Sequence, residues 1–423
     1  MKSFQETKLE NGLRVITSPV PSDSITLLVL VGAGSRYEEL AISGISHFIE
    51  HMFFKGASRF KNTKQVSEAI DAVGGQFNAF TGKEYAGYYV KLAKESKEIA
   101  FDVIGDMLIN PTFDREEIDK ERGVIMEELN MYQDTPMYQI GWDFEKLLFG
   151  DQPMGRDQIG TKELIKGVTH EQFMTYHDEL YGSENTVISV AGNITHEEIL
   201  TLVNKYFPFK ISKKKRSWAK FEGYDTKNKV IMQEKKTEQA HLIIGFPGYH
   251  TTHPDFMAEK LMAIVLGGNM SSRMFLNVRE AQGLCYSIHT TTDDYSDCGH
   301  LSTSAGVDVN RIDQAVSSIV QEYAKLRSQP KIDENELTKA KSYLYGKLVI
   351  NLEDSQEVAH LIGKQAMLNE GIKTLDTIHD MIKKVTLDDV ARVALDLLDE
   401  SKMKLAFIGP ERTKESFEKL MKF

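Results

Sequence analysis

Apolar residues follow two different spacings along the chain, and each spacing predicts a different kind of element. Unbroken or alternating apolar runs of strand length occur at 13–17, 25–31, 76–81, 85–92 and 186–191. Helical spacing occurs at 66–73, 94–109, 114–132, 136–148 and 196–206. The turn Gly82-Lys83 predicts a hairpin, and Asp114 with Glu117 predicts a capping box at a helix N-terminus. The run 25–31 is of the continuous type expected for a buried strand.

The second half of the chain repeats the order of elements found in the first half. The strand 187–192 and the helix after it have a counterpart in the strand 404–409 and the final helix. The strand 27–31 and its following helix correspond in the same way to 241–245 and 255–266. A period near half the chain indicates duplicated domains rather than a solenoid.

Between about 208 and 228 the periodic pattern lapses into a polar stretch with a basic run at 213–216, which is typical of a solvated linker. We therefore expect a first domain at 1–212, a linker at 213–227 and a second domain at 228–423. Strands, hairpins and helices together predict an α+β fold. Each half is expected to be α/β-sandwich-like, a mostly antiparallel sheet with helices packed on one face.

The composition is that of a globular protein that can bury large cores, with 41% hydrophobic and 27% charged residues among 423. The net charge of −11 argues against nucleic acid and against an anionic membrane as partners. Cys285 and Cys298 are too few for a disulfide framework or a cysteine-rich metal site. The sequence shows no targeting segment and no apolar run long enough to span a bilayer, so we expect a cytoplasmic protein.

One helical stretch carries a polar stripe on an otherwise apolar surface. His47 and His51, four residues apart, lie on one helix face, and Glu50 shares that face. Ser43 and Gly56 fit the N-cap and C′ positions of this helix. The two imidazoles can bind one Zn²⁺ and leave Glu50 beside it as a general base for water. Ordinary core histidines are the alternative that the motif alone leaves open.

A zinc peptidase site needs a third protein ligand. The predicted helix 114–132 offers several glutamates: Glu116, Glu117, Glu121, Glu127 and Glu128. Helical geometry puts Glu121 and Glu128 nearly in line, with Glu127 about 100° away. Spacing does not choose among them, because an exposed acidic helix face would have the same pattern.

The motif His47-x-x-Glu50-His51, followed by the segment from Glu121 to Glu128, resembles the inverzincin zinc peptidases. This family includes pitrilysin, insulin-degrading enzyme and the mitochondrial processing peptidase. The resemblance continues at 9–15, 31–38, 78–81 and 266–273, so it extends over both halves. By size the chain is most similar to the bacterial single-subunit homologues of the processing peptidase β subunit.

The resemblance implies a role for each of these residues. It makes Glu50 the catalytic base and Glu121 a carboxylate that orients a metal ligand and tunes its basicity. The ligands of the one Zn²⁺ expected per chain would be His47, His51 and Glu128. Glu127 would be the third ligand instead if the helix register differed by one residue.

The resemblance also implies where a peptide substrate binds. The family's substrate-binding edge, to which an extended peptide adds as another strand, corresponds to Asn78, Ala79, Phe80 and Thr81. Arg279 and Tyr286 in the second half match the family's pair that binds the substrate carbonyl near the scissile bond. Gln282, between them, stands where relatives often have a basic residue, which could shift substrate preference.

In the long single-chain relatives, the zinc site and the Arg/Tyr pair come from opposite halves of a clamshell. This chain has the length of one such subunit and carries both sets, which implies a homodimer in which Arg279 and Tyr286 of one copy serve the zinc of the other. The expected function is a zinc-dependent endopeptidase that cleaves unfolded peptides or short polypeptides inside the clamshell chamber. A non-catalytic peptide-binding or assembly subunit is the alternative, and the complete zinc set argues against it. A peptidase active only beside a different partner chain is a third reading.

Overall fold

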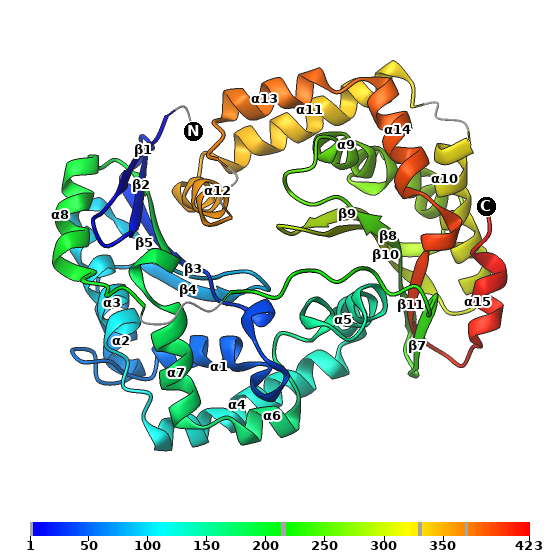
Figure 1. Cartoon of the computed structure of the whole chain (residues 1–423). Helices are drawn as coiled ribbons and strands as arrows, with labels where there is room; N and C mark the ends of the chain where they lie inside the picture. The colour runs from blue at the N-terminus through cyan, green and yellow to red at the C-terminus, as the bar shows by residue number, and fades with distance from the viewer. Residues whose placement is uncertain (1–2, 213–216, 329–331, 369–370) are drawn as a thin grey trace. The chain divides into compact units, whose positions relative to one another are not determined.

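The computed structural model describes residues 3–212, 217–328, 332–368 and 371–423. The chain forms two compact units, each assembled from three stretches of sequence (Figure 1). Unit 1 comprises Met1–Leu129, Asp157–Ala219 and Leu348–Ile378, and unit 2 comprises Asn130–Arg156, Lys220–Lys347 and His379–Phe423. Residues 213–216 of the expected linker lie outside the described residues. The linker predicted at 213–227 would separate the two duplicated halves of the sequence, and this boundary stays a prediction.

Unit 1 contains a six-stranded sheet in the order β1-β2-β6-β3-β5-β4. Its strands are β1 (Gln5–Lys8), β2 (Arg14–Pro19), β3 (Ser24–Val31), β4 (Gln76–Thr81), β5 (Ala86–Ala93) and β6 (Thr186–Gly192). The pair β2 and β6 runs parallel, and the other neighbouring pairs run antiparallel. β4 therefore lies at one edge of the sheet, after the predicted hairpin turn.

Helices cover both faces of this sheet. α3 (Lys97–Ile109) and α8 (His196–Tyr206) lie on one face, and α12 (Ser355–Met367) packs on the other across β3 and β6 (Figure 1). Leu28 and Leu30 of β3 belong to the same apolar cluster as Val358 and Ile362 of α12. Because β3 is covered on both sides, almost all its residues are buried, which explains its unbroken apolar sequence. The other helices that begin in unit 1 are α1 (Ile45–Phe53), α2 (Thr63–Asp71), α4 (Arg115–Asp134), α6 (Lys162–Gly167), α7 (His170–Leu180) and α13 (Leu375–Lys384).

Unit 2 contains a five-stranded sheet in the order β7-β11-β8-β10-β9. Its strands are β7 (Val230–Glu234), β8 (Gln239–Gly248), β9 (Cys285–Asp294), β10 (Gly299–Asp308) and β11 (Lys404–Gly409). β7 and β11 run parallel, and the remaining neighbours are antiparallel. This repeats the order and directions of β2-β6-β3-β5-β4, and it pairs β6 with β11 and β3 with β8 as the sequence predicts.

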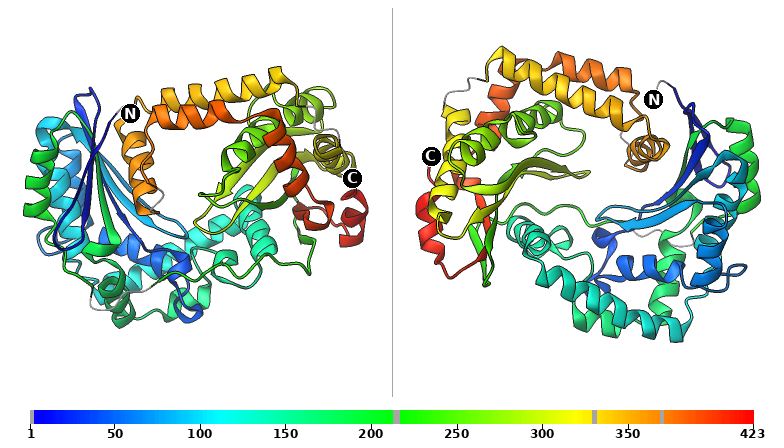
Figure 2. Two further views of the ribbon diagram at one scale, coloured as in Figure 1. Left: turned by 45° about the horizontal axis from the view of Figure 1, so that its top comes forward. Right: turned by 180° about the vertical axis from the view of Figure 1, so that it is seen from behind.

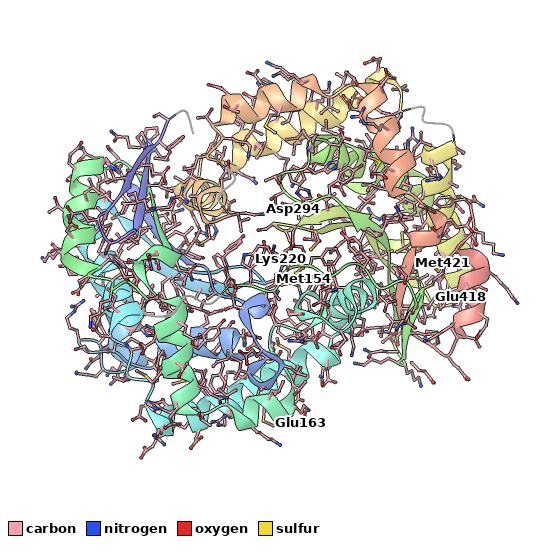
Figure 3. The ribbon with its side chains drawn as sticks, in the orientation of Figure 1. Met154, Glu163, Lys220, Asp294, Glu418 and Met421 are labelled. Carbon is pink, nitrogen blue, oxygen red and sulfur yellow. The ribbon has the colours of Figure 1, made fainter. Side chains whose placement is uncertain are left out.

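The sheet of unit 2 is also covered on both faces (Figure 2). One face packs on α9 (Phe256–Gly267), α10 (Ile312–Ser328), α14 (Leu387–Leu397) and α15 (Lys414–Leu420). The other face packs on α5 (Pro136–Phe149), where Phe144 contacts the cluster that contains Ile243 and Ile408. α11 (Glu334–Asn351) begins in this unit. At the end of the chain, Glu418 of α15 is exposed, whereas Met421, directly after α15, is buried (Figure 3).

The predicted α+β fold with two homologous, mostly antiparallel halves is confirmed. The expectation of helices on a single face is incomplete, because α12 and α5 each cover the second face of a sheet. The Asp114 half of the capping box predicted for α4 is confirmed, since the Asp114 carboxylate accepts hydrogen bonds from the amides of Glu116 (2.9 Å) and Glu117 (3.1 Å). Among the described residues, none of the helices combines the length and the apolar character needed to cross a bilayer.

Candidate active site

The helix α1 carries the His-x-x-Glu-His motif, and a buried carboxylate fixes its N-terminus. Glu38 accepts hydrogen bonds from the backbone amides of Gly44 (2.7 Å) and Ser46 (2.8 Å). Gly44, with φ of +95°, is the N-cap residue, and a Cβ there would lie 2.3 Å from the Ile159 carbonyl oxygen. The expectation that Ser43 is the N-cap is therefore wrong. The helix is capped by a side chain from the preceding loop rather than by its own neighbour.

The end of α1 also differs from the expectation. The helix ends at Phe53 with Phe54 as its C-cap residue, so Gly56 lies two residues beyond the cap and not at C′. Gly56 has a φ of +151°, and a Cβ there would meet the Lys61 carbonyl oxygen at 2.5 Å. The glycine is needed for the close approach of the following loop.

The apolar positions of α1 are fully buried, and its polar stripe is only partly buried. Phe48, Ile49, Met52 and Phe53 are each at most 1% exposed. The polar side chains between them are half-buried: His47, Glu50 and His51. This division matches the predicted stripe. The apolar side chains anchor the helix in unit 1 and leave the three polar groups accessible on one side.

α4 brings a carboxylate to the two histidines. Nε2 of His47 lies 3.6 Å from one oxygen of Glu128, and Nε2 of His51 lies 3.4 Å from the other. Ligand atoms of the three side chains all lie within 4.8 Å of one another. Contacts with both imidazoles lower the pKa of the Glu128 carboxyl well below its ordinary value. Glu127, the fallback ligand, is exposed and is not part of this cluster.

This group of atoms has the chemistry of a zinc site. Two imidazoles and one carboxylate form a His₂Glu donor set, which leaves a fourth position for water. Within the described residues, Nδ1 of His47 is buried and has no hydrogen-bond partner, and Nε2 of the same ring faces Glu128. The residues present therefore fit a bound zinc ion.

Glu121 fixes the orientation of His51. Its carboxylate contacts Nδ1 of His51 at 2.9 Å, which leaves Nε2 of the same ring directed to Glu128. Burial lowers the pKa of His51, but the two carboxylates outweigh burial and raise it to about 9. Lys55 contacts the other oxygen of Glu121 at 2.5 Å. The sequence did not assign Lys55, although its position four residues after His51 is a signal that could have suggested it.

Glu50 is held by the end of the edge strand. The hydroxyl of Thr81 donates a hydrogen bond to the Glu50 carboxylate and contacts the Ser46 carbonyl at 3.3 Å. Burial raises the pKa of Glu50, and the Thr81 hydrogen bond and the nearby imidazoles oppose that shift only in part. A carboxyl group with a raised pKa is a better proton acceptor than an ordinary glutamate, as a general base requires.

Two buried tyrosines, Tyr88 and Tyr181, lie close enough to Glu50 for its charge to raise their pKa values. The hydroxyls of Tyr88 and Tyr181 are 2.8 Å apart. Burial, and then charges that include Glu50, raise the pKa of the Tyr88 hydroxyl well above its ordinary value. Burial does the same for Tyr181. Both phenols are neutral at any physiological pH, so they add no charge near Glu50.

β4 has the geometry of a strand that can accept a peptide. It forms the edge of the sheet in unit 1, next to β5. The ring of Phe77 lies 5.8 Å from that of Phe54, just after α1. Asn78 is exposed, and its side-chain oxygen accepts a hydrogen bond from the Ala79 amide at 2.9 Å.

The loop between β3 and α1 holds the hairpin that β4 and β5 form. The amide of Arg36 donates to the Lys83 carbonyl at 3.0 Å, and its guanidinium contacts Glu84 at 2.5 Å. Both charged side chains are buried, and the ring of Trp218 lies 4.2 Å from the guanidinium carbon. One loop therefore positions both the helix with the candidate metal ligands, through Glu38, and the edge strand, through Arg36.

The predicted Arg/Tyr pair lies together in unit 2. Arg279 stands on a π-helix, Phe275–Glu280, and its guanidinium carbon lies 4.4 Å from the Phe275 ring centroid. The same carbon is 5.8 Å from the ring of Tyr286, which is 75% exposed at the start of β9. Gln282 binds the Asn277 carbonyl at 2.8 Å. The pair is formed within one unit, and the candidate metal ligands belong to the other.

Comparison with known proteins gives a family for the chain. Residues 14–157 match the family model described as Insulinase (Peptidase family M16), and residues 167–344 match the Peptidase M16 inactive domain. An uncharacterized zinc protease of Bacillus subtilis is 36% identical over 95% of this chain and 97% of its own length. The chain belongs to the M16 peptidase family. This membership confirms the resemblance to the inverzincin zinc peptidases.

A second relative and two solved structures are also similar to this chain. An uncharacterized zinc protease of Streptomyces coelicolor is 34% identical over 98% of this chain and 91% of its own length. A protease from Helicobacter pylori superposes with a TM-score of 0.90 at 21% identity, over 97% of this chain and 100% of that chain. The peptidase M16 inactive domain from Pseudomonas fluorescens gives 0.89 at 18% identity, over 97% and 98%. At these identities the solved structures support the fold alone.

Proposed function

We propose that this protein is a zinc-dependent endopeptidase that cleaves unfolded peptides or short polypeptides. The observation that carries the proposal is the convergence of His47, His51 and Glu128 within 4.8 Å beside the half-buried carboxylate of Glu50. Family membership supports the same chemistry, because the similar proteins are named zinc proteases. We also propose that it acts in the cytoplasm.

The three clustered side chains would hold one zinc ion per chain, with Glu121 fixing the ring of His51. When bound, the ion supplies Lewis acidity that lowers the pKa of water and polarises a carbonyl group. Glu50 takes a proton from the attacking water and later gives it to the leaving amine. Thr81 holds the Glu50 carboxylate in place through its hydroxyl. These residues therefore divide metal binding and proton transfer between them.

The peptide is proposed to add as a strand to β4, along Asn78 to Thr81, where the backbone supplies most of the hydrogen bonds. This mode tolerates many sequences, as cleavage of unfolded chains requires. Arg279 and Tyr286 are proposed to donate hydrogen bonds to the developing oxyanion. We propose that they do so across a homodimer, with the pair of one copy serving the metal site of the other in a chamber between the copies.

The first experiment separates metal binding from proton transfer. Wild type, Glu50→Gln, Glu128→Gln and Glu127→Gln are compared for zinc content and for cleavage of an unfolded peptide. We expect Glu50→Gln to keep its zinc and to lose about 10²–10⁴-fold in turnover, which is the contribution typical of general base catalysis. Glu128→Gln should lose zinc as well as activity. Glu127→Gln is the matched control, because Glu127 is next to Glu128 in sequence but is exposed and outside the cluster. This variant should keep both its zinc and its activity.

Substantial activity in Glu50→Gln would contradict its role as the base.

A second experiment tests the dimer. Inactive Glu50→Gln and weakly active Tyr286→Phe proteins are mixed, so that a mixed dimer contains one site with both residues intact if the pair acts across copies. We expect mixing to restore activity. No recovery after subunit exchange, or full activity in a monomer, would contradict a shared site.

A further inference from the structure

A short segment, residues 217–219, lies against the loop that precedes α1. The Ala219 amide donates a hydrogen bond to the Arg36 carbonyl at 3.0 Å, and the Arg36 guanidinium donates one to the Ala219 carbonyl at 2.8 Å. The ring centroid of Trp218 lies 4.2 Å from the guanidinium carbon of Arg36. Residues 217–219 fall within the predicted linker, but these contacts attach them to unit 1.

Arg36 connects residues 217–219 to the end of the hairpin that β4 and β5 form. Its guanidinium makes a buried ion pair with Glu84 at 2.5 Å, and its amide donates to the Lys83 carbonyl at 3.0 Å. A buried ion pair resists separation, because moving one partner away leaves an uncompensated charge. Arg36 therefore holds Lys83 and Glu84 in place, and residues 217–219 hold Arg36.

Trp218 supplies the side-chain part of this support. The guanidinium of Arg36, a residue that is 1% exposed, lies over its ring. The attraction between a cation and an aromatic face is stronger where water is excluded. The hydrogen bonds between Arg36 and Ala219 use the backbone of Ala219. Replacing Trp218 therefore removes the ring contact without removing any group that makes these hydrogen bonds.

The hairpin end in turn positions the proposed catalytic base. Gly82 follows Thr81 directly, and its carbonyl accepts a hydrogen bond from the Ser35 amide at 3.3 Å. A Cβ at Gly34 would lie 2.5 Å from the same carbonyl oxygen, so the loop and the hairpin end are in close contact. The Thr81 hydroxyl donates to the Glu50 carboxylate. A shift of the hairpin end therefore moves the hydroxyl that orients Glu50.

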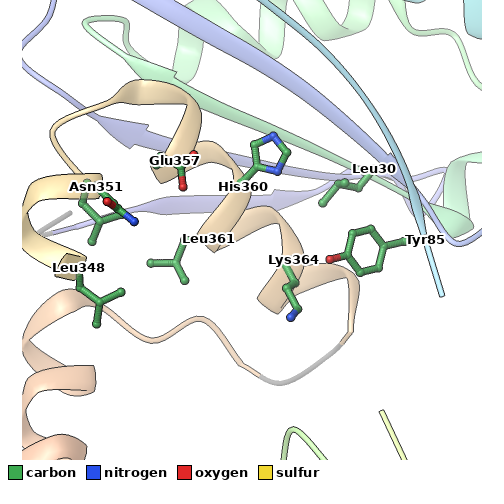
Figure 4. Close-up of a pocket in the computed structure, with 9 residues that line it drawn as sticks. Leu30, Tyr85, Leu348, Asn351, Glu357, His360, Leu361 and Lys364 are labelled. Carbon is green, nitrogen blue, oxygen red and sulfur yellow. The ribbon is translucent and has the colours of Figure 1, made fainter. Parts of the chain in front are cut away.

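The α12 side of the hairpin end gives it less support. There Tyr85, just after the turn, lines a pocket of about 230 Å³ together with Leu361 and Lys364 of α12 (Figure 4). A void gives the side chains around it no packing contacts on that side. Packing against α12 therefore leaves room for the hairpin end to shift, and the contacts of Arg36 are needed to fix its position.

We propose that Trp218 is a positioning residue for the peptidase reaction. Through Arg36 it holds the hairpin end, and through Thr81 the hairpin end holds the carboxylate of Glu50. The inference rests on the proposed peptidase function. It gives a segment of the predicted linker a role in the candidate active site of unit 1.

Steady-state cleavage of an unfolded peptide by zinc-loaded proteins tests the proposal, with the zinc content of each protein measured. We expect Trp218→Ala to lose about tenfold in kcat, since a misplacement of about 1 Å in an active site can cost about 100-fold. Its KM should stay within about twofold of wild type, because no backbone group of β4 is removed. Trp218→Phe keeps an aromatic ring beside the guanidinium and should restore most of kcat.

A control variant and a double variant show whether Trp218 acts through Thr81. Tyr206→Ala is the matched control, because Tyr206 is also half-buried and its ring lies 4.7 Å from a cation, Nζ of Lys205. It stands at the end of α8, outside the loop and the hairpin, and this variant should keep the wild-type kcat. Thr81→Val removes the hydroxyl that holds Glu50. In that background Trp218→Ala should lower kcat by less than about twofold, because both changes release the same carboxylate.

The outcomes separate this proposal from the proposed function. If zinc-loaded wild type cleaves no peptide, the peptidase function fails. If wild type cleaves the peptide but Trp218→Ala keeps its kcat, or lowers kcat equally with Thr81 and with Val at position 81, the positioning role is wrong and the function stands. If Trp218→Ala does not fold, Trp218→Leu takes its place, since leucine is apolar but has no ring. A kcat of Trp218→Leu equal to that of Trp218→Phe would then overturn the proposal, and a lower one would support it.

Discussion

Replacing Glu38 with alanine tests whether a buried carboxylate in the preceding loop holds α1, the helix that carries the two candidate metal ligands His47 and His51. Glu38 is 4% exposed and accepts hydrogen bonds from the amides of Gly44 at 2.7 Å and Ser46 at 2.8 Å. These amides belong to the first turn of α1, where no backbone acceptor is available. Without Glu38, both amides are left buried and unpaired, directly before His47.

The magnitude follows from those two amides. Each buried donor left without a partner costs about 1–3 kcal/mol, so the pair sets an upper range of about 2–6 kcal/mol. Burial raises the pKa of Glu38, because burying the charged carboxylate costs free energy. That cost offsets part of the stabilisation from the two hydrogen bonds. We therefore expect Glu38→Ala to lower the free energy of unfolding by about 2–3 kcal/mol. Glu38→Gln keeps one acceptor oxygen and should lose about half as much.

Urea unfolding of the metal-free proteins at one pH measures the effect. Glu39→Ala is the matched control, because the neighbouring glutamate is exposed and its loss should change stability by less than about 0.5 kcal/mol. Zinc titration provides a second readout, since a frayed first turn displaces His47 and should weaken metal binding in Glu38→Ala. If Glu38→Ala were as stable as Glu39→Ala, the carboxylate would not be the cap of α1, and the reasoning from its two hydrogen bonds would be refuted.

Two further predictions concern buried charges. Burial raises the pKa of Glu259 to about 8, above its ordinary value of 4.5, although the Tyr249 amide donates to it at 3.1 Å. The stability that this group contributes is complete below about pH 4.5 and is lost as the pH rises through about 8. In urea unfolding, the free energy of unfolding of Glu259→Gln relative to wild type should therefore rise by up to about 4 kcal/mol from pH 5 to pH 9. An equal difference at both pH values would contradict this. Arg36→Met removes the buried guanidinium 2.5 Å from Glu84 and should cost about 3–5 kcal/mol. Arg36→Met/Glu84→Gln should cost less, and an equal loss would show that the pair is not coupled.

The sequence by itself was sufficient to predict the structural elements that depend on the spacing of nearby residues. The period of apolar residues predicts α1 with His47, Glu50 and His51 on one face, because helical geometry fixes which residues share a face. The order of strands and helices along the chain predicts that the two halves repeat, and the strand order of the two sheets agrees. The resemblance to a family then chose Glu128 over Glu127, which spacing alone could not do.

The tertiary structure decided the contacts that join distant segments. α12 covers the sheet of unit 1, and α5 covers that of unit 2, although each helix is encoded in the other half of the sequence. The unbroken apolar run of β3 signalled that both of its faces are covered, but it did not identify the helix that covers the second face. Many amphipathic helices present similar apolar surfaces, so only chain connectivity and packing select the partner.

The site shows the same division. Ser43 looked like the N-cap of α1, but Glu38 makes the capping hydrogen bonds. Thr81 holds Glu50 across 31 residues of sequence. Such hydrogen bonds depend on where a folded loop or strand places a side chain, and sequence spacing carries no information about that position. The residues that come together in the candidate site could therefore be named from the sequence, whereas the groups that hold them in place are a property of the folded chain.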